Sequence, residues 1–378
     1  MAYGKKNKVK IDPFSYNIGL LGEPGIGKTT IIKEMCEKNL GEDGYLFVEC
    51  GKEDGADAIE GISYINCPEY SAEYDEYNNS VGFSELIEDI IENKSTEYPD
   101  LKVVVIDTYD QLREIVIPEV VRRHNKENPE KRVKSIKAAF GGYMAGEDMV
   151  DDIILEALWS LKTVGVHFIC IGHLKQREIT DAITGDSFMQ VTTDMSMRSF
   201  NKLKNKLHFL GVATINREII KEKKNAKSKE EKGVITGESR QITFRDDNYS
   251  IDSKSRFASI SSQIDFNADV LYQTLCDAIE AESKKSGRSV EDIKAEQEKA
   301  EAKRLKEIAD AEEKNKKDKE DEKELKASIT KINSYIKENI NNKSNLNPIL
   351  LKLKEVGVKK PDEITSLEDA KAILEIIG

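Results

Sequence analysis

The sequence predicts an α/β fold, with a mostly parallel, twisted sheet and helices on both of its faces. A glycine-rich segment at residues 22–30 stands between a short apolar run, residues 18–21, and a helical pattern at residues 29–39. Further apolar runs alternate with helical periodicity; they are residues 44–50, 62–66, 101–107, 164–172 and 207–215. Because strands that alternate with helices pair in parallel, these runs predict one parallel sheet.

The glycine-rich segment matches the pattern G-x-x-x-x-G-K-[ST] of the phosphate-binding P-loop. Its glycines allow backbone conformations that bring successive N–H groups onto a phosphate chain. Lys28 is expected to reach the outer phosphates, and the Thr29 hydroxyl can ligate Mg²⁺. The predicted nucleotide-binding residues are Gly22, Glu23, Pro24, Gly25, Ile26, Gly27, Lys28, Thr29 and Thr30.

Residues 101–107 form a nearly continuous apolar run that ends in Asp107. This is typical of a central parallel strand that is buried on both faces and delivers an acid to the carboxyl edge of the sheet. We therefore predict that Asp107 organises Mg²⁺ together with Thr29. Asp110 is a weaker substitute for Asp107.

Hydrolysis needs a group that orients the attacking water. In AAA+ proteins that group is usually a Glu directly after the acidic strand end, where this chain has Thr108. In RecA-like proteins a Glu follows the strand after the P-loop helix, and here Glu49 and Glu53 stand in that region. Both carboxylates remain candidates; Glu53 is slightly favoured because an exposed turn can point at the γ-phosphate.

Residues after the 164–172 strand are candidates for reading and stabilising the γ-phosphate. His173 is predicted to sense it, while Lys175 and Arg177 are candidate fingers on a neighbouring subunit's nucleotide. Lys254 and Arg256 form a second candidate finger pair. His124 and His208 are expected to be structural.

Residues 177–206 are predicted to form a long mobile loop near the active edge, and loops of that length are usually functional. Its cations and aromatic residue suit single-stranded DNA, because charge follows phosphates and a ring stacks on a base. The candidate contacts are Arg198, Phe200, Lys202, Lys204 and Lys206. A solvated basic face is the alternative.

Composition limits the class of protein. The 378 residues carry a net charge of -12, so any nucleic-acid contact must be a local patch. Five scattered cysteines predict neither a zinc site nor a disulfide framework, which fits a reducing cytoplasm. The basic N-terminus lacks a following apolar stretch, and no run is apolar enough to span a membrane, so a cytoplasmic protein without membrane contact is expected.

Composition also predicts three parts. Residues 1–282 are expected to form the core, after a polar lead-in at 1–15. Residues 283–326 are dominated by charged residues and predict a solvated single helix or a partly disordered tether. Apolar periodicity returns in residues 327–378, which predict a small helical module for a partner or for self-association.

Five segments, in their order and spacing, resemble the bacteriophage RecA-core ATPases over about residues 14–282. The segments are residues 22–30, 49–55, 103–107, 172–175 and 254–257. The resemblance implies a RecA-like protein that hydrolyses ATP with Mg²⁺, forms a homo-oligomeric ring or filament and is stimulated by single-stranded DNA. It implies recombination or replication in a host cytoplasm, often alongside a single-strand-binding protein.

Two other functions compete with this interpretation. The chain could be a nucleotide-switched adaptor or helicase loader that recruits a replication partner through its C-terminal module. A P-loop kinase of a small molecule is less favoured, because no acceptor pocket is visible in the sequence.

Overall fold

The computed structural model describes residues 9–53, 55–181, 184–223, 231–246, 250–285, 289–339 and 343–377. The chain divides into two compact units, Met1–Ala302 and Lys303–Gly378. This division lies within the charged segment that the sequence predicts as a linker. Each unit has a hydrophobic core of its own.

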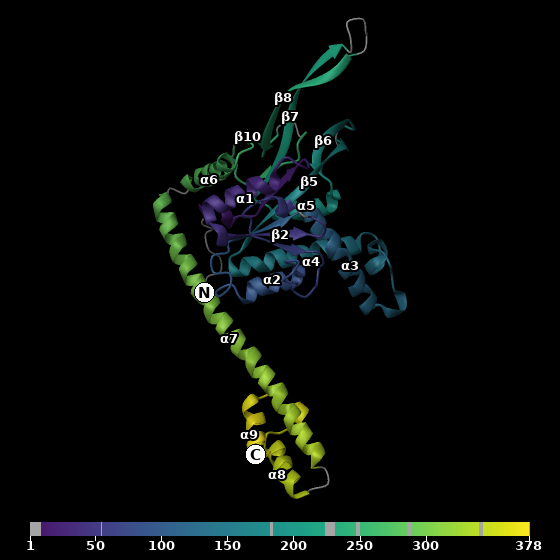
Figure 1. The fold of residues 1–378 in the computed structure, drawn as a ribbon, viewed down its shortest axis with the longest axis vertical. Coiled ribbons are helices and arrows are strands. Elements are labelled where there is room, and N and C mark those ends of the chain that lie inside the picture. The colour runs from purple at the N-terminus through teal and green to yellow at the C-terminus, as the bar shows by residue number, and fades with distance from the viewer. Residues whose placement is uncertain are drawn as a thin grey trace. The chain divides into compact units, whose positions relative to one another are not determined.

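The first unit is built on a twisted sheet with the strand order β10-β8-β7-β1-β5-β4-β2-β3 (Figure 1). Its parallel strands are β1 (Ile18–Gly22), β2 (Tyr45–Cys50), β3 (Tyr64–Cys67), β4 (Val103–Asp107), β5 (His167–Thr180) and β7 (Phe209–Lys223). Its antiparallel strands are β6 (Ser187–Thr193), β8 (Glu231–Thr243), β9 (Lys254–Ser255) and β10 (Gln263–Asp265).

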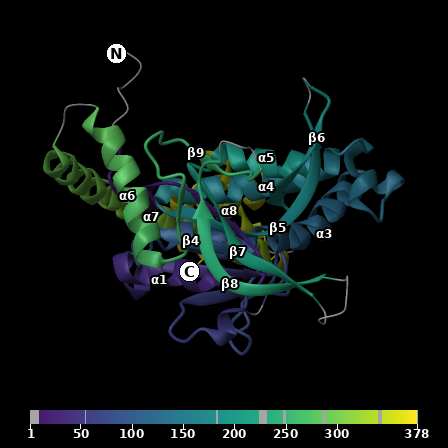
Figure 2. The ribbon, with the colours of Figure 1, turned by 90° about the horizontal axis from the view of Figure 1, so that it is seen from above.

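Helices cover both faces of the sheet, as Figures 1 and 2 show. On one face lie α1 (Lys28–Leu40) and α6 (Ala268–Lys284). On the other lie α2 (Phe83–Glu92), α3 (Tyr109–Glu127) and α4 (Ala145–Leu161), with α5 (Met197–Lys206) after β6. Every residue of β1 and β4 is buried, as apolar runs between two helix layers require. The predicted α/β fold with a mostly parallel sheet is confirmed.

The prediction of a long loop at 177–206 is wrong. β5 continues to Thr180 and pairs in antiparallel with β6, and α5 then runs from Met197 to Lys206. Ser196 caps this helix by accepting a hydrogen bond from the Ser199 N–H. Phe200 and Leu203 form its buried face. Short stretches with high polarity concealed both elements, because their outward-facing residues outnumber the buried ones.

The sequence predicts a charged connector at residues 221–233, but residues 221–223 and 231–233 belong to strands. β7 extends to Lys223 and β8 begins at Glu231, so the two strands form a long hairpin. The sequence also predicts residues 240–245 as the partner strand of a hairpin, and residues 240–243 of that segment are the end of β8. Residues 224–230 of the connector and residues 1–8 of the polar lead-in lie outside the described residues.

The core of the second unit is formed by the end of α7 (Val290–Glu338) with α8 (Lys343–Glu355) and α9 (Leu367–Ile377). Its fully buried members are apolar: Ile332, Ile349, Leu353, Ile364, Ala370 and Ile373. α7 is one continuous helix of 49 residues. Within α7 the charged segment is therefore a helix and not a disordered tether. None of the described helices combines the length and hydrophobicity needed to cross a bilayer.

Candidate active site

The P-loop connects the end of β1 to the start of α1 at the carboxyl edge of the sheet. Gly25 and Gly27 have φ angles of 76° and 101°, in the left-handed region that side chains disfavour. A Cβ on Gly22 would lie 2.9 Å from the Lys28 side chain and 3.1 Å from that of Ile26. The loop can therefore close around Lys28 only with glycine at these positions.

Lys28 lies inside this loop and is 7% exposed. Its Nζ donates hydrogen bonds to the carbonyl oxygens of Gly22 and Glu23, each at 3.1 Å. Burial lowers the pKa of Lys28, and the nearby carboxylates of Asp107 and Asp110 oppose that shift. The ammonium is thus held at the rim of the loop, where a phosphate chain would accept its hydrogen bonds.

Asp107 ends β4 and accepts a hydrogen bond from the Thr29 hydroxyl, with 2.6 Å between Oγ1 and Oδ2. Burial raises the pKa of Asp107, and the Thr29 hydrogen bond and the charges of Lys28 and His173 counteract the shift. Mg²⁺ prefers oxygen ligands and is usually held by one or two protein groups together with substrate phosphates. A hydroxyl and a carboxylate in contact beside the P-loop fit Mg²⁺ and a nucleotide.

The two candidate glutamates differ in their surroundings. Glu49 lies near the end of β2, opposite Asp107 in the strand register, and is 3% exposed. Its Oε1 accepts a 2.6 Å hydrogen bond from the Ala56 N–H, which holds the turn after β2. Glu53 is half-buried, and its Oε1 lies 3.3 Å from the Thr108 hydroxyl, next to Asp107. Glu53 is therefore the carboxylate that extends toward the strand end, while Glu49 supports the turn.

His173 continues β5 directly beside Gly22 of β1. Its Nδ1 lies 2.9 Å from Oδ2 of Asp110 in the first turn of α3. This hydrogen bond raises the pKa of His173 above its ordinary value, although burial opposes the rise. The pKa of Asp110 is lowered, because the contact with His173 outweighs burial, which by itself would raise it. Asp110, considered from sequence only as a metal ligand, here orients a histidine.

Two arginines of the β7–β8 hairpin also reach the P-loop, and the sequence alone did not single them out. The Arg240 guanidinium donates to the Ile26 carbonyl at 3.1 Å, and the Arg217 guanidinium lies 3.5 Å from the Glu23 carboxylate. The ring of Phe266 lies 3.5 Å from where a Cβ of Gly27 would stand. The pairing of β7 with β1 brings the hairpin to this edge, and this pairing is a property of the fold.

Among the finger candidates, Lys175 and Arg177 lie on the β5–β6 hairpin. Lys175 Nζ forms an exposed ion pair with Asp194 at 3.2 Å. The Arg177 guanidinium donates to the carbonyl oxygens of Asp194, at 2.9 Å, and of Met195. Both side chains are therefore held within their own chain in this structure.

The second finger pair lies at the opposite, amino edge of the sheet. Lys254 donates to the Lys204 carbonyl at 2.5 Å, and Arg256 donates to the Asn205 carbonyl at 2.6 Å. Next to them His208 accepts a hydrogen bond from the Asn17 N–H, and burial, Arg256, Lys162 and Lys254 lower its pKa to about 4. This cluster of cations is too far along the strands to serve the P-loop of its own chain.

The DNA contacts predicted on residues 177–206 are mostly engaged within the chain. Arg198 pairs with Asp148, and Lys202 lies 3.0 Å from both Asp148 and Asp152 of α4. Lys204 pairs with Asp252. Phe200 is 0% exposed, so its predicted stacking on a base is wrong. Lys206 is exposed, with its Nζ 5.3 Å from the Trp159 ring centre.

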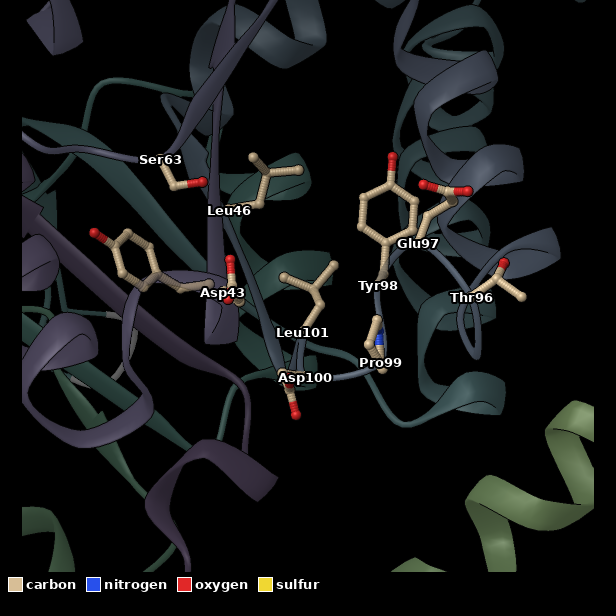
Figure 3. A pocket seen from close by; sticks show the side chains of 10 residues that line it. Asp43, Leu46, Ser63, Thr96, Glu97, Tyr98, Pro99, Asp100 and Leu101 are labelled. Atoms are coloured by element: carbon tan, nitrogen blue, oxygen red, sulfur yellow. The ribbon is translucent and has the colours of Figure 1, made fainter.

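A cavity of about 410 Å³ lies at the start of β2, away from the P-loop (Figure 3). Tyr98 and Leu101 line it together with the acidic side chains of Asp43, Glu97 and Asp100. Because β2 ends, rather than starts, at the nucleotide edge, this cavity is separate from the candidate active site.

The carboxyl edge has the geometry of the P-loop ATPases, in which a phosphate chain is held between the loop and an acidic strand end. Within that class, the chain belongs to the family described as an AAA domain, whose model matches residues 15–257. No curated protein matches the chain. The solved structures similar to it include a KaiC-like protein from the archaeon Pyrococcus horikoshii OT3. That protein is 16% identical, with 66% of this chain and 83% of that chain covered and a TM-score of 0.32.

The predicted P-loop ATPase class is therefore confirmed. The family description contains the word AAA, yet the residue after Asp107 is Thr108, whose hydroxyl contacts Glu53 from the turn after β2. The carboxylate that contacts the residue after Asp107 therefore comes from the turn after β2.

Proposed function

We propose that this protein is an ATP-hydrolysing, RecA-like ATPase that acts on single-stranded DNA in phage recombination or replication, alongside a single-strand-binding protein. One observation carries the proposal. A single strand, β5, places His173 beside Gly22 of the P-loop and continues into the antiparallel hairpin with β6. A change at the γ-phosphate would therefore be transmitted along one strand away from the nucleotide site.

The residues of the carboxyl edge divide the chemistry among them. The P-loop N–H groups and Lys28 hold the phosphates and stabilise charge that develops on them. Thr29 and Asp107 would hold Mg²⁺, which neutralises phosphate charge when it is bound with ATP. Glu53 orients the attacking water and accepts its proton, and His173 contacts the γ-phosphate.

The site is completed by a neighbouring copy. Arg256 is exposed within a group of cations at the amino edge, whereas the carboxylates of Asp107, Asp110 and Glu53 gather at the carboxyl edge. Contact between unlike edges is heterologous and generates a ring or a filament. We therefore favour Arg256, which has a single carbonyl partner in its own chain, as the residue donated to the next nucleotide. Lys175 is paired with a carboxylate and Arg177 donates to two carbonyl oxygens, so both rank behind it.

Two assays test the proposal. ATP turnover is measured with and without a single-stranded oligonucleotide, and stimulation is expected. Lys28→Ala and Arg256→Ala, each inactive alone, should recover activity when mixed, because some interfaces then combine an intact P-loop with an intact Arg256. Mixtures of Lys28→Ala with Lys175→Ala or Arg177→Ala show whether another finger is used. Turnover that ignores DNA, together with no DNA retained on a filter, overturns the proposal.

A second function, a nucleotide-switched adaptor or helicase loader, is favoured by the second unit. This unit has a core of its own and exposes Leu350, Leu351 and Ile376 at 51%, 63% and 40%. A chain truncated after Ala302 distinguishes the two functions. A DNA-acting core keeps binding single strands, whereas an adaptor keeps ATP binding and loses its effect on helicase loading.

A further inference from the structure

The end of α3 and the segment that joins it to α4, residues 126–144, project from the side of the sheet and are called the basic protrusion (Figures 1 and 2). It exposes five cations: Lys126, Lys131, Arg132, Lys134 and Lys137. No ion pair within the described part of the chain involves any of them, and the acids beside them are Glu127 and Glu130. In a chain with a net charge of -12, this is a local concentration of available positive charge.

The backbone of the protrusion is held in place from α3. His124 accepts a hydrogen bond from the Phe140 N–H at Nδ1, 3.1 Å away, and its Nε2 lies 3.1 Å from the Lys131 carbonyl. Asn125 makes a reciprocal pair with Val133, at 2.7 Å and 2.9 Å. The cations are therefore presented by a fixed loop, which lowers the entropic cost of ordering them on a partner.

An aromatic side chain stands at the end of the same loop. Tyr143 is 99% exposed, and residues 140–144 all have positive φ angles, three of them in non-glycine residues. Such a backbone costs free energy and persists where the surroundings over-determine it, often at ligand contacts. Next to Tyr143, a Cβ on Gly142 would lie 3.5 Å from the Lys137 carbonyl, so the backbone segments that carry Tyr143 and Lys137 lie close together.

The protrusion is also connected to the nucleotide edge. α3 begins two residues after Asp107, and Arg113 in its second turn contacts the first turns of α4. The Arg113 guanidinium lies 2.8 Å from Asp151 and 3.0 Å from Glu147. Tyr143 and Met144 directly precede α4. A shift of the strand end at Asp107 would therefore reach them through α3 and the ion pairs of Arg113.

We infer that the basic protrusion is the surface on which this protein holds a single-stranded nucleic acid, with the cations along the phosphates and Tyr143 stacked on a base. Cations interleaved with an aromatic ring suit single strands, because every base offers a face for stacking. The inference rests on the proposed action on single-stranded DNA and assigns its surface. It replaces α5, where Arg198, Lys202 and Lys204 are paired with Asp148, Asp152 and Asp252.

The test measures binding of a labelled single-stranded oligonucleotide to the full chain by fluorescence anisotropy, with a non-hydrolysable ATP analogue, across a salt series. The variant Lys131→Ala/Arg132→Ala/Lys134→Ala should bind at least tenfold more weakly. Its salt dependence should be flatter by about 0.7 for each phosphate that is left without a neutralising cation. Tyr143→Ala should weaken binding about fivefold or more at an unchanged salt slope.

A matched control is Lys314→Ala/Lys316→Ala/Lys317→Ala, which removes the same charge from exposed positions of α7. It should bind as the wild type does, and all variants should keep the wild-type melting temperature. If the wild type binds DNA and the protrusion variants bind equally well, or if the control is weakened as much, the assignment is wrong while the proposed function stands. If the wild type binds no single strand, or prefers a duplex or anionic vesicles, the proposed function fails first.

Discussion

The two edges of the parallel sheet give the same residue type opposite properties. At the carboxyl edge His173 faces Asp110, and its pKa is raised. At the amino edge His208 is buried near Arg256, Lys162 and Lys254, and its pKa falls to about 4. One edge therefore holds a histidine beside a carboxylate, while at the start of β7 the other edge places a buried histidine among cations.

The parallel arrangement makes this separation possible. All strands that carry Gly22, Asp107 and Glu49 end on one side, so the groups that meet a nucleotide collect there. His208 stands at the opposite end, immediately before β7, and Arg256 donates its N–H to the His208 carbonyl at 2.9 Å. Substitutions at each edge should therefore have different consequences, for turnover at one and for acid stability at the other.

Lys28→Ala should lower ATP turnover by about 10²–10³-fold, because it removes the ammonium that meets the phosphates among the carboxylates. Turnover is measured at saturating ATP. Lys38→Ala on the same helix is the control, since Lys38 forms only an exposed ion pair with Asp269, and it should stay within about twofold of the wild type. Equal losses of turnover in both variants would mean that the loss comes from a destabilised α1 and not from the missing Lys28 ammonium.

Glu53→Gln should lower turnover by about 100-fold with little change in stability, because it removes a base that contacts Thr108 at the surface of the site. Glu49→Gln should instead cost about 1 kcal/mol of unfolding free energy, since a neutral amide accepts from the Ala56 N–H more weakly than the buried carboxylate does. Urea titrations and turnover are measured on both. A stable, inactive Glu49→Gln protein would reverse the two roles.

Asp110→Asn should lower turnover about tenfold at pH 8 and less at pH 6. Asp110 raises the pKa of His173; Lys28 opposes that shift and Glu53 supports it. Without the carboxylate the pKa of His173 falls, so the cationic form is lost at a lower pH, and a decrease of one pKa unit moves the alkaline limb by about one pH unit. An alkaline limb that does not move would show that the charge of His173 plays no part.

His208→Asn should make stability less sensitive to acid. Because the folded pKa of His208 is depressed to about 4, the unfolded chain binds more protons between that pH and its ordinary value. The contribution of His208 to the free energy of unfolding is therefore fully present above about pH 6.5 and is lost as the pH is lowered toward 4. Between pH 7 and 5 the wild type should lose about 1 kcal/mol more than the variant, after allowance for partial exposure. Identical losses would place the acid sensitivity elsewhere.

The parts of the site that depend only on neighbouring residues are determined by the amino-acid sequence. The P-loop needs glycines and Lys28 at fixed spacing, and the run before Asp107 can only be a strand buried on both faces. Both are properties of a few consecutive residues, so they were readable without the fold. The alternation of strands and helices predicted the parallel sheet for the same reason.

Which distant groups meet depends on how the chain packs. Glu49 and Glu53 look equivalent in sequence, but the turn at Ala56 engages one and Thr108 contacts the other. Asp110 and His173 are 63 residues apart, and their pairing depends on α3 starting beside β5. α5 and the basic protrusion are likewise both rich in Lys and Arg, and the sequence does not distinguish them. Whether a charge is available depends on the acids that packing brings to it, and α4 brings Asp148 and Asp152 to α5 alone.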